Sequence, residues 1–257
     1  MVQLEMIAHV RELAQADERI VSVLMYGSFM KGEGDIYSDI EFYLFCRADF
    51  DHREWVAGIR PVLLFFTNEH GTEVAIFDNL IRGEFHFAPA AERGIVRSWE
   101  GKTSFRHADN MVLVDKDGGL GEILSGIDRG TPPFDSPESV RWIGESLVNH
   151  LLMVRGLIER GEWVHAQQNF QYIQMHLLWL IRVEAGALGH WESPSKKAET
   201  DLPPEAYDAY VRCVPQAGEQ SLRMCYGHAL ELSERLFNAC HVPDDVRAVL
   251  HKIKTGW

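Results

Sequence analysis

Two acidic residues, Asp39 and Glu41, have the spacing of a metal site on a β-strand. They begin an apolar run that continues to Phe45 and predicts a strand, on which every second side chain points to the same face. Asp39 and Glu41 therefore project together, while Ile40 between them points into the core. No basic residue lies beside them in sequence, so the two carboxylates repel each other at neutral pH. A hard cation such as Mg²⁺ would relieve this repulsion, since it prefers oxygen ligands and is usually held by one or two carboxylates and substrate phosphates.

A small-residue turn, Gly27-Ser28, lies about ten residues before these acids and ends another apolar run. That run, Ile20 to Tyr26, predicts a buried strand. Phosphate oxygens can approach Gly27 closely because it has no Cβ, and Ser28 offers a hydroxyl and a backbone N–H at the start of a short helix. Lys31 would share the helical face of Ser28 and neutralise phosphate charge. We therefore predict a nucleotide site in which one element holds a triphosphate and the other holds the metal bound to it.

A third acid, Glu84, lies in the segment 83–87, where polar and apolar residues alternate strictly. The two phenylalanines belong to the core face, which puts Glu84 and His86 together on the other face. If this strand pairs near the Asp39 strand, Glu84 lies beside the predicted metal ligands. Crowded carboxylates raise each other's pKa, which suits Glu84 to act as a general base toward an acceptor hydroxyl. From the spacing alone, a solvent-facing acid is an equal alternative.

The whole pattern resembles the signature of the nucleotidyltransferase superfamily of DNA polymerase β, which includes antibiotic-modifying enzymes. Its parts are Gly-Ser, a spacer of about ten residues, and Asp-x-Glu between two strands. Longer segments resemble the lincosamide nucleotidyltransferases, densely over residues 18 to 90 and weakly after that. The matching segments are 25–28, 31–35, 37–43, 71–74 and 76–87.

This resemblance implies a reaction and a role for each site residue. The reaction is transfer of a nucleoside monophosphate, AMP from ATP, to a hydroxyl of a lincosamide such as lincomycin or clindamycin, with release of pyrophosphate. Glu84 is the catalytic base by resemblance, and a homodimer is implied in the same way. Asp39 and Glu41 are expected to hold Mg²⁺, while the phosphates are expected at Gly27, Ser28 and Lys31.

Several alternatives stay open at the level of sequence. An aminoglycoside nucleotidyltransferase would use the same catalytic residues with another pocket. A nucleotidyltransferase-fold antitoxin or regulator is the non-enzymatic alternative. Glu73 is a competing third carboxylate or faces solvent. Arg82 and His86 either contact the phosphates or the acceptor, or have structural roles. The structural role would be a salt bridge for Arg82 and packing for His86.

Composition narrows the class of partner. The chain of 257 residues is 46% hydrophobic and 25% charged, which is typical of a soluble globular protein. Its net charge of −13 argues against a nucleic-acid partner and suits a cationic small substrate. No apolar run approaches membrane-spanning length and no leader pattern is visible, so we expect a cytoplasmic protein without membrane association. The cysteines are scattered, which predicts reduced thiols: Cys46, Cys213, Cys225 and Cys240.

The N-terminal part has the pattern of a mixed sheet with flanking helices. An amphipathic helix is expected over residues 2–15, and a hairpin over 61–67 and 72–77. A short helix is expected over 89–99, a last strand over 111–114, and a charged solvent loop over 47–54. These elements surround the two strands that carry the acids.

The clearest turn and loop signal in the chain, from Gly130 to Pro137, predicts a domain boundary. We therefore expect a catalytic domain over residues 1–130 and a substrate-binding or dimerisation domain over 131–257. Ser136 followed by Pro137 predicts a helix N-cap and first helical position. Beyond it, apolar residues recur every three to four positions in three long stripes, with shorter helices expected after Pro204 and Pro243. The predicted fold class is thus α+β: a nucleotidyltransferase sheet followed by an all-α helical bundle. Amides and aromatics on the second long helix either line an acceptor pocket or form a solvent face.

Overall fold

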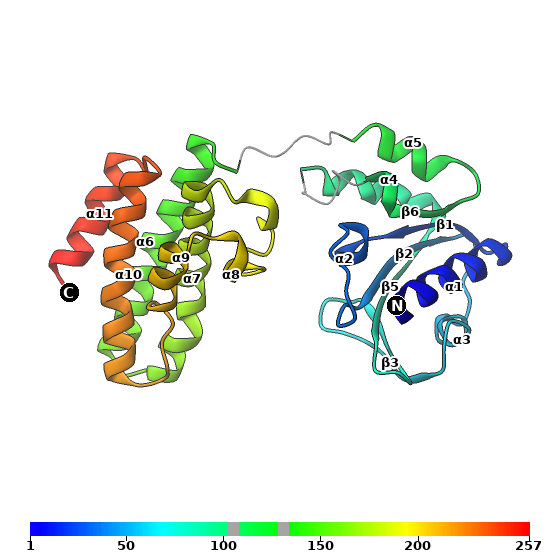
Figure 1. Cartoon of the computed structure of the whole chain (residues 1–257), viewed down its shortest axis with the longest axis horizontal. Coiled ribbons are helices and arrows are strands. Elements are labelled where there is room, and N and C mark those ends of the chain that lie inside the picture. Colours follow the sequence, from blue (N-terminus) through cyan, green and yellow to red (C-terminus); the bar gives the residue numbers. More distant parts are fainter. Residues whose placement is uncertain (102–107, 128–133) are drawn as a thin grey trace. The chain divides into compact units, whose positions relative to one another are not determined.

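The computed structural model describes residues 1–101, 108–127 and 134–257 and confirms the α+β class. The chain divides into two compact units, Met1–Thr131 and Pro132–Trp257, and each is described by itself. Part of the predicted boundary segment, residues 130–133, lies outside the described residues. The first unit contains the sheet and the second is helical (Figure 1).

The sheet of the first unit has six strands in the order β3-β4-β5-β2-β1-β6. β2 and β5 pair in parallel, whereas every other neighbouring pair is antiparallel. The expected hairpin is present as β3 and β4. The strands are β1 Ile20–Met25, β2 Ile40–Cys46, β3 Val62–Thr67, β4 Glu73–Phe77, β5 Arg82–Pro89 and β6 Val112–Asp115.

Strand alternation separates a core face from a polar face at the centre of this sheet. On β2, Ile40, Phe42 and Leu44 are fully buried, while the residues between them are half-buried. The expected first helix, α1 Val2–Ala16, packs on this core through one apolar stripe that includes Met6 and Val10 (Figure 1). The acids at the start of β2 are consequently left on the opposite, accessible face.

The expected charged loop at 47–54 is partly wrong, because it leads into the helix α3 His52–Ala57. Asp51 caps this helix by accepting a hydrogen bond of 2.9 Å from the backbone N–H of Glu54. Asp-x-x-Glu is a variant of the helix-start signature, so the charges expected to be solvated are in part capping groups. The remaining described helices of the unit are α2 Gly27–Met30, the 3₁₀ helix η1 Ala90–Trp99, α4 Ala108–Met111 and α5 Gly119–Ser125, of which α4 and α5 were not predicted.

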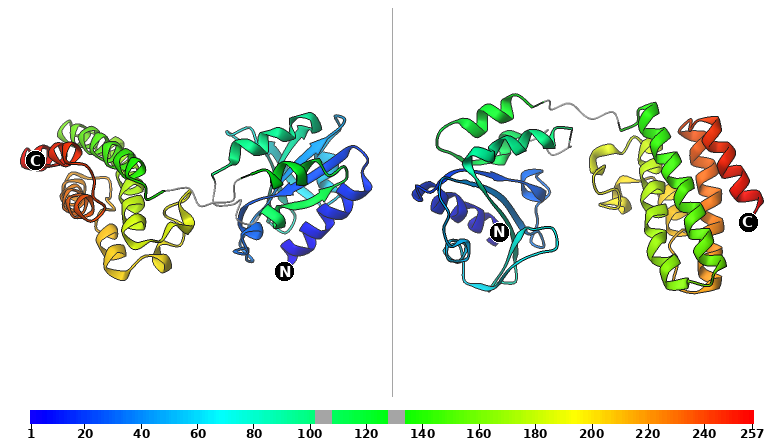
Figure 2. Two further views of the ribbon diagram at one scale, coloured as in Figure 1. Left: turned by 90° about the horizontal axis from the view of Figure 1, so that it is seen from above. Right: turned by 180° about the vertical axis from the view of Figure 1, so that it is seen from behind.

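The second unit is the predicted helical bundle. Its first helix, α6, begins as expected, with Ser136 accepting a hydrogen bond from the backbone N–H of Ser139 and Pro137 in the first turn. α6, α7 and α10 pack together, and α11 covers α6 and α10 (Figure 2). The bounds are α6 Pro137–Glu159, α7 Trp163–Ala185, η3 Leu188–His190, α8 Ala198–Asp201, α9 Pro204–Val211, α10 Glu219–Ala239 and α11 Asp244–Thr255.

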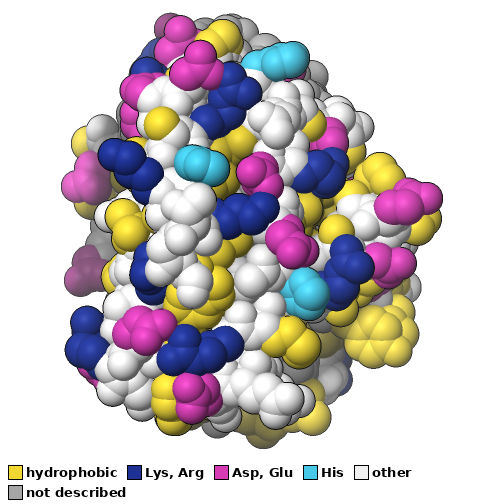
Figure 3. All heavy atoms as spheres, turned by 90° about the vertical axis from the view of Figure 1, so that its left-hand side faces the viewer, with side chains coloured by type: hydrophobic (Ala, Val, Ile, Leu, Met, Phe, Trp, Pro, Cys, Tyr) yellow, Lys and Arg dark blue, Asp and Glu magenta, His cyan; other side chains and the backbone are white. Residues whose placement is uncertain are grey.

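Acids and bases are mixed on one face of this helical unit (Figure 3). Several acids and bases of the helical unit pair with each other: Arg223 contacts Glu159 and Glu219, and Lys254 contacts Glu234. The face therefore carries no extended field of one sign. No helix among the described residues is long and apolar enough to cross a membrane. All four cysteines are free thiols.

Candidate active site

The acids predicted from sequence meet where β2 and β5 run in parallel. Glu41 is the Cα partner of Glu84, and Tyr43 is the partner of His86. Partnered residues in a parallel ladder point to the same face, so two columns of polar side chains lie next to each other. The β2 column is Asp39, Glu41 and Tyr43, and the β5 column is Arg82, Glu84 and His86.

Gly27 makes direct room for one of these acids. Its φ is +76°, which is strained for any residue with a side chain, and a Cβ at this position would lie 1.3 Å from Oε2 of Glu41. The backbone N–H of Ser28 also bonds the Glu41 carboxylate. We expected phosphate oxygens to lie against Gly27, but the Glu41 carboxylate occupies this space. Ser28 Oγ is buried and has no hydrogen-bond partner within the described residues.

Burial of Glu41 raises its pKa to about 7, and repulsion from Asp39 and Glu84 adds to this. The Ser28 hydrogen bond and the charge of Arg82 oppose the shift without cancelling it. Glu41 is therefore an acid that is about half protonated at neutral pH and that a bound cation would fully ionise.

Arg82 neutralises the other two acids. Its guanidinium donates through one terminal nitrogen to Oδ2 of Asp39 and through the other to Oε1 of Glu84. The Arg82 side chain is 46% exposed, so it has room to move away from them. The sequence left two roles open for Arg82, a contact with phosphate or acceptor and a salt bridge. In the structure Arg82 forms the salt bridge.

A chain of hydrogen bonds orients Glu84 from its other side. The hydroxyl of Tyr26 donates to Oε2 of Glu84 over 3.2 Å, and Nε2 of His86 lies 3.0 Å from the same hydroxyl. Tyr26 has one hydroxyl proton, so His86 must carry its own proton on Nε2 to complete the chain. Burial lowers the pKa of His86 and raises that of Tyr26, which keeps both groups uncharged.

The packing around His86 explains its fixed position. Its ring stacks on Tyr43 with 4.1 Å between centroids and 3° between planes. Sequence alternation placed His86 beside Glu84, but it gave Tyr26 no role, since Tyr26 belongs to a different strand end. The signal that could have found it is its position directly before Gly27.

The remaining candidates lie apart from this cluster. Glu73 on β4 is the ladder partner of Phe85, which points to the core face of the sheet. The Glu73 carboxylate lies 2.9 Å from Nδ1 of His52. It is therefore not a third metal ligand. Lys31 follows the last residue of α2, and its ammonium group makes no ion pair with another described residue.

The fit of a metal ion depends on the donor set. Asp39 and Glu41 present hard carboxylate oxygens on one face, two residues apart, which suits Mg²⁺. Over residues 1–101, 108–127 and 134–257, no three His, Cys, Asp or Glu side chains are already arranged to hold a metal ion. Arg82 holds the Asp39 oxygen in this state, so a metal ion at this acid has to displace it.

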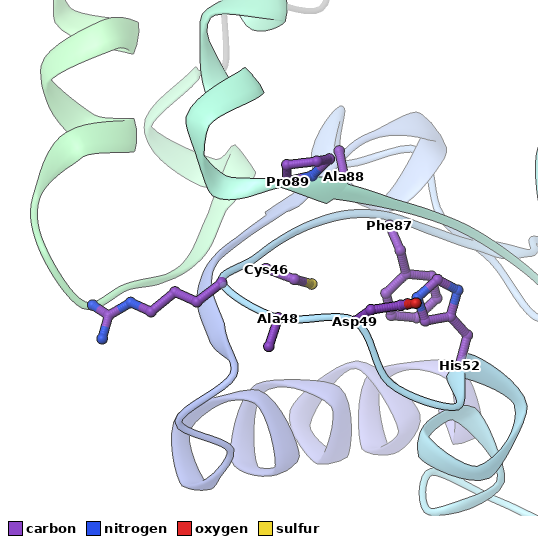
Figure 4. Close-up of a pocket in the computed structure, with 8 residues that line it drawn as sticks. Cys46, Ala48, Asp49, His52, Phe87, Ala88 and Pro89 are labelled. Carbon is purple, nitrogen blue, oxygen red and sulfur yellow. The ribbon is translucent and has the colours of Figure 1, made fainter.

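A separate pocket of about 260 Å³ lies at the other ends of these strands (Figure 4). It is bordered by Cys46 and Pro89, which close the β2–β5 ladder, and by His52, whose ring stacks on Phe87 at 3.9 Å. None of the site residues expected from sequence borders this pocket.

Paired acids beside a Gly-Ser turn, on a mixed sheet followed by a helical bundle, are the features of a nucleotidyltransferase. Residues 136–254 match the family described as "Lincosamide nucleotidyltransferase-like, C-terminal domain". The match lies within the helical unit, and it supports a nucleotidyltransferase of the antibiotic-modifying type.

Two solved structures resemble the chain at low identity. An aminoglycoside 6-adenyltransferase from Bacillus subtilis is 15% identical with a TM-score of 0.42, over 98% of this chain and 97% of that one. A nucleotidyltransferase-like protein from Exiguobacterium sibiricum is 11% identical with a TM-score of 0.39, over 98% and 80%. No match was found among curated proteins.

Proposed function

We propose that this protein transfers AMP from ATP to a hydroxyl group of a lincosamide antibiotic, in an Mg²⁺-dependent reaction that releases pyrophosphate. The observation that carries the proposal is the ladder register, in which Glu84 lies opposite Glu41, and Glu41 follows Asp39 by two residues. The proposed base for the acceptor hydroxyl, Glu84, then lies beside the two proposed metal ligands, Asp39 and Glu41, on rigid strands. Phosphoryl transfer depends mostly on such positioning and charge stabilisation.

Asp39 and Glu41 are the residues that would hold the metal ion. When bound, Mg²⁺ supplies positive charge that neutralises the transferring phosphate. Ser28 contributes its unpaired hydroxyl and Lys31 its ammonium group to the phosphates. With a cation at Asp39, the Arg82 guanidinium would be free of this carboxylate and could donate to phosphate oxygens.

Glu84 accepts the proton of the acceptor hydroxyl. The hydroxyl oxygen forms a bond to the α-phosphorus as the bond to pyrophosphate breaks, and the proton passes to the carboxylate. Tyr26 holds Oε2 of Glu84, which leaves Oε1, now bonded to Arg82, to receive that proton. Tyr26 and His86 are positioning residues in this scheme, because they act through Glu84.

The test is a mass spectrum of lincomycin and clindamycin after incubation with the protein, ATP and Mg²⁺. A mass gain of one AMP unit on either drug is expected, with pyrophosphate formed in equal amount. Kanamycin and streptomycin are included in the panel. Modification of these and of neither lincosamide would overturn the assignment of the acceptor, and consumption of no triphosphate with any drug would overturn the activity.

A further inference from the structure

A second feature of the first unit is a pocket of about 410 Å³ at the start of β2 and β5. One wall is the loop before β2, with Ile36 and Tyr37, and the other is the turn between β4 and β5, with Leu80. Asp39 and Arg82 border the same pocket. It therefore adjoins the candidate active site, and its volume is within the range of small-molecule sites.

Three of the residues that line this pocket are large, apolar and exposed. The exposed fractions are 65% for Ile36, 88% for Tyr37 and 76% for Leu80. Leu80 is also in the left-handed region with φ +62°, a conformation that Asn or Gly adopts far more readily. A large apolar residue that is both exposed and strained beside a polar site points to a contact with a ligand.

Both walls are held in place without a ligand. The side chain of Asp35 accepts a hydrogen bond of 2.8 Å from the N–H of Tyr37, and Gln3 donates to the carbonyl of Ser38 over 3.2 Å. On the other side, Asn79 accepts from the N–H of Ile81 over 3.1 Å. The apolar groups are thus presented on fixed turns, so a ligand need not order them on binding.

Among the polar residues that line the pocket, Arg82 and Asp39 lie on the side of the proposed base. Arg82 donates to Glu84 from the rim of the pocket. A molecule whose apolar part lies between Tyr37 and Leu80 would have its other end at Arg82 and Asp39. A hydroxyl at that end would be next to Glu84.

We propose that this pocket is the subsite for the apolar part of the acceptor, with Ile36, Tyr37 and Leu80 as specificity-determining residues. The inference depends on the proposed function and narrows the acceptor to an amphiphilic molecule that carries a hydroxylated ring and an apolar tail. An acceptor with only hydroxyl and amino groups gains nothing from these side chains.

The test uses Leu80→Asn and Tyr37→Ser in the full chain. Asn suits the left-handed backbone and removes the apolar surface, so Leu80→Asn is expected to fold at least as well as the natural chain. The control is Leu63→Ser, which removes another exposed apolar side chain, 60% exposed on β3, that does not line the pocket. The readouts are kcat and KM for clindamycin and for ATP, and the Kd of clindamycin by calorimetry without nucleotide.

We expect both pocket variants to raise the KM and Kd of clindamycin roughly tenfold, as for a lost buried apolar side chain. The kcat and the KM of ATP should stay within about twofold, since no phosphate ligand is changed. Leu63→Ser should match the natural chain in every readout.

The failure of the subsite and of the proposed function can be told apart. Transfer to clindamycin with unchanged KM in both variants overturns the subsite and leaves the function standing. Clindamycin binding that weakens in both variants, without transfer in any protein, supports the subsite and overturns the function. Unchanged clindamycin binding together with a lower melting temperature would assign these side chains to packing within the protein and also overturn the subsite.

Discussion

Glu41 and Glu84 are direct partners in the parallel ladder between β2 and β5, and they differ in what surrounds them. Glu41 lies against Gly27 and is mostly buried, whereas Glu84 is held between Tyr26 and Arg82. Two glutamates in one ladder pair therefore have different chemical environments. In the proposed mechanism Glu41 would hold a cation and Glu84 would accept a proton.

Replacing the proposed base should separate chemistry from binding. Glu84→Gln keeps the shape and the hydrogen bond to Tyr26 but cannot accept a proton. We expect kcat to fall by roughly 10²-fold or more, the usual scale of a lost general base, with nucleotide affinity little changed. Single-turnover kinetics and nucleotide titration measure the two effects. Weaker nucleotide binding at unchanged kcat would make Glu84 a metal or phosphate ligand instead.

The metal role of Asp39 predicts a variant without activity. Asp39→Asn should abolish turnover while the fold remains intact by circular dichroism, because an amide is a poor ligand for a hard cation. Removal of divalent ions by a chelator should have the same effect on the natural chain, and added Mg²⁺ should restore activity. Turnover that persists in the chelator would rule the metal role out.

Gly27 and Gly32 form a matched pair for testing the close contact with Glu41. Both have a left-handed backbone, with φ of +76° and +74°, but only Gly27 has a neighbour where a Cβ would be, as Gly32 has none within 4 Å. Gly32→Ala should cost about 1–2 kcal/mol of unfolding free energy from backbone strain alone. Gly27→Ala should cost more and also weaken nucleotide binding, since the Glu41 carboxylate has to move. Equal losses in urea unfolding would contradict the contact.

The raised pKa of Glu41 predicts a dependence of stability on pH. The folded protein binds the proton more tightly than the unfolded chain, whose value is near 4.5, so the stabilisation is complete below about pH 4.5 and is lost as pH rises through about 7. We expect the natural chain, in metal-free buffer, to lose unfolding free energy between pH 5 and 8 relative to Glu41→Gln. Added Mg²⁺ should reduce this loss, because it favours the ionised form. Parallel curves for the two proteins would show that Glu41 titrates normally.

In the proposed site Arg82 would compete with a cation for Asp39, which gives a prediction of opposite sign from an ordinary active-site change. Arg82→Gln leaves two acids without their counter-ion, so Mn²⁺ should bind the nucleotide-free protein several-fold more tightly while metal-free stability falls by about 1 kcal/mol or less. Calorimetry and urea unfolding measure these values. Arg60→Gln is the control, since it breaks a surface ion pair with Asp78 that involves neither Asp39 nor Glu84. Weaker Mn²⁺ binding in Arg82→Gln would exclude competition.

Local patterns in the sequence determined much of the architecture. The alternation around Asp39 and Glu84 predicted both strands and the face of each acid, and the Ser136-Pro137 pair predicted the start of α6. The apolar stripes after it predicted the long helices. These features depend on residues within one turn or one strand, where a side chain's period fixes its face. The helix α3 was missed because its capping charges were interpreted as a solvated loop.

The tertiary structure alone decided which side chains meet. The pairing of β2 with β5 joins segments about forty residues apart, and a slip of one residue would turn Glu84 away from Glu41. The same packing brought Tyr26 and Arg82 to Glu84 and sent Glu73 to His52. No local period contains this information, because register depends on how the whole sheet buries its core face. The sequence by itself therefore determined the residues able to do the chemistry, and the sheet decided which of them act together.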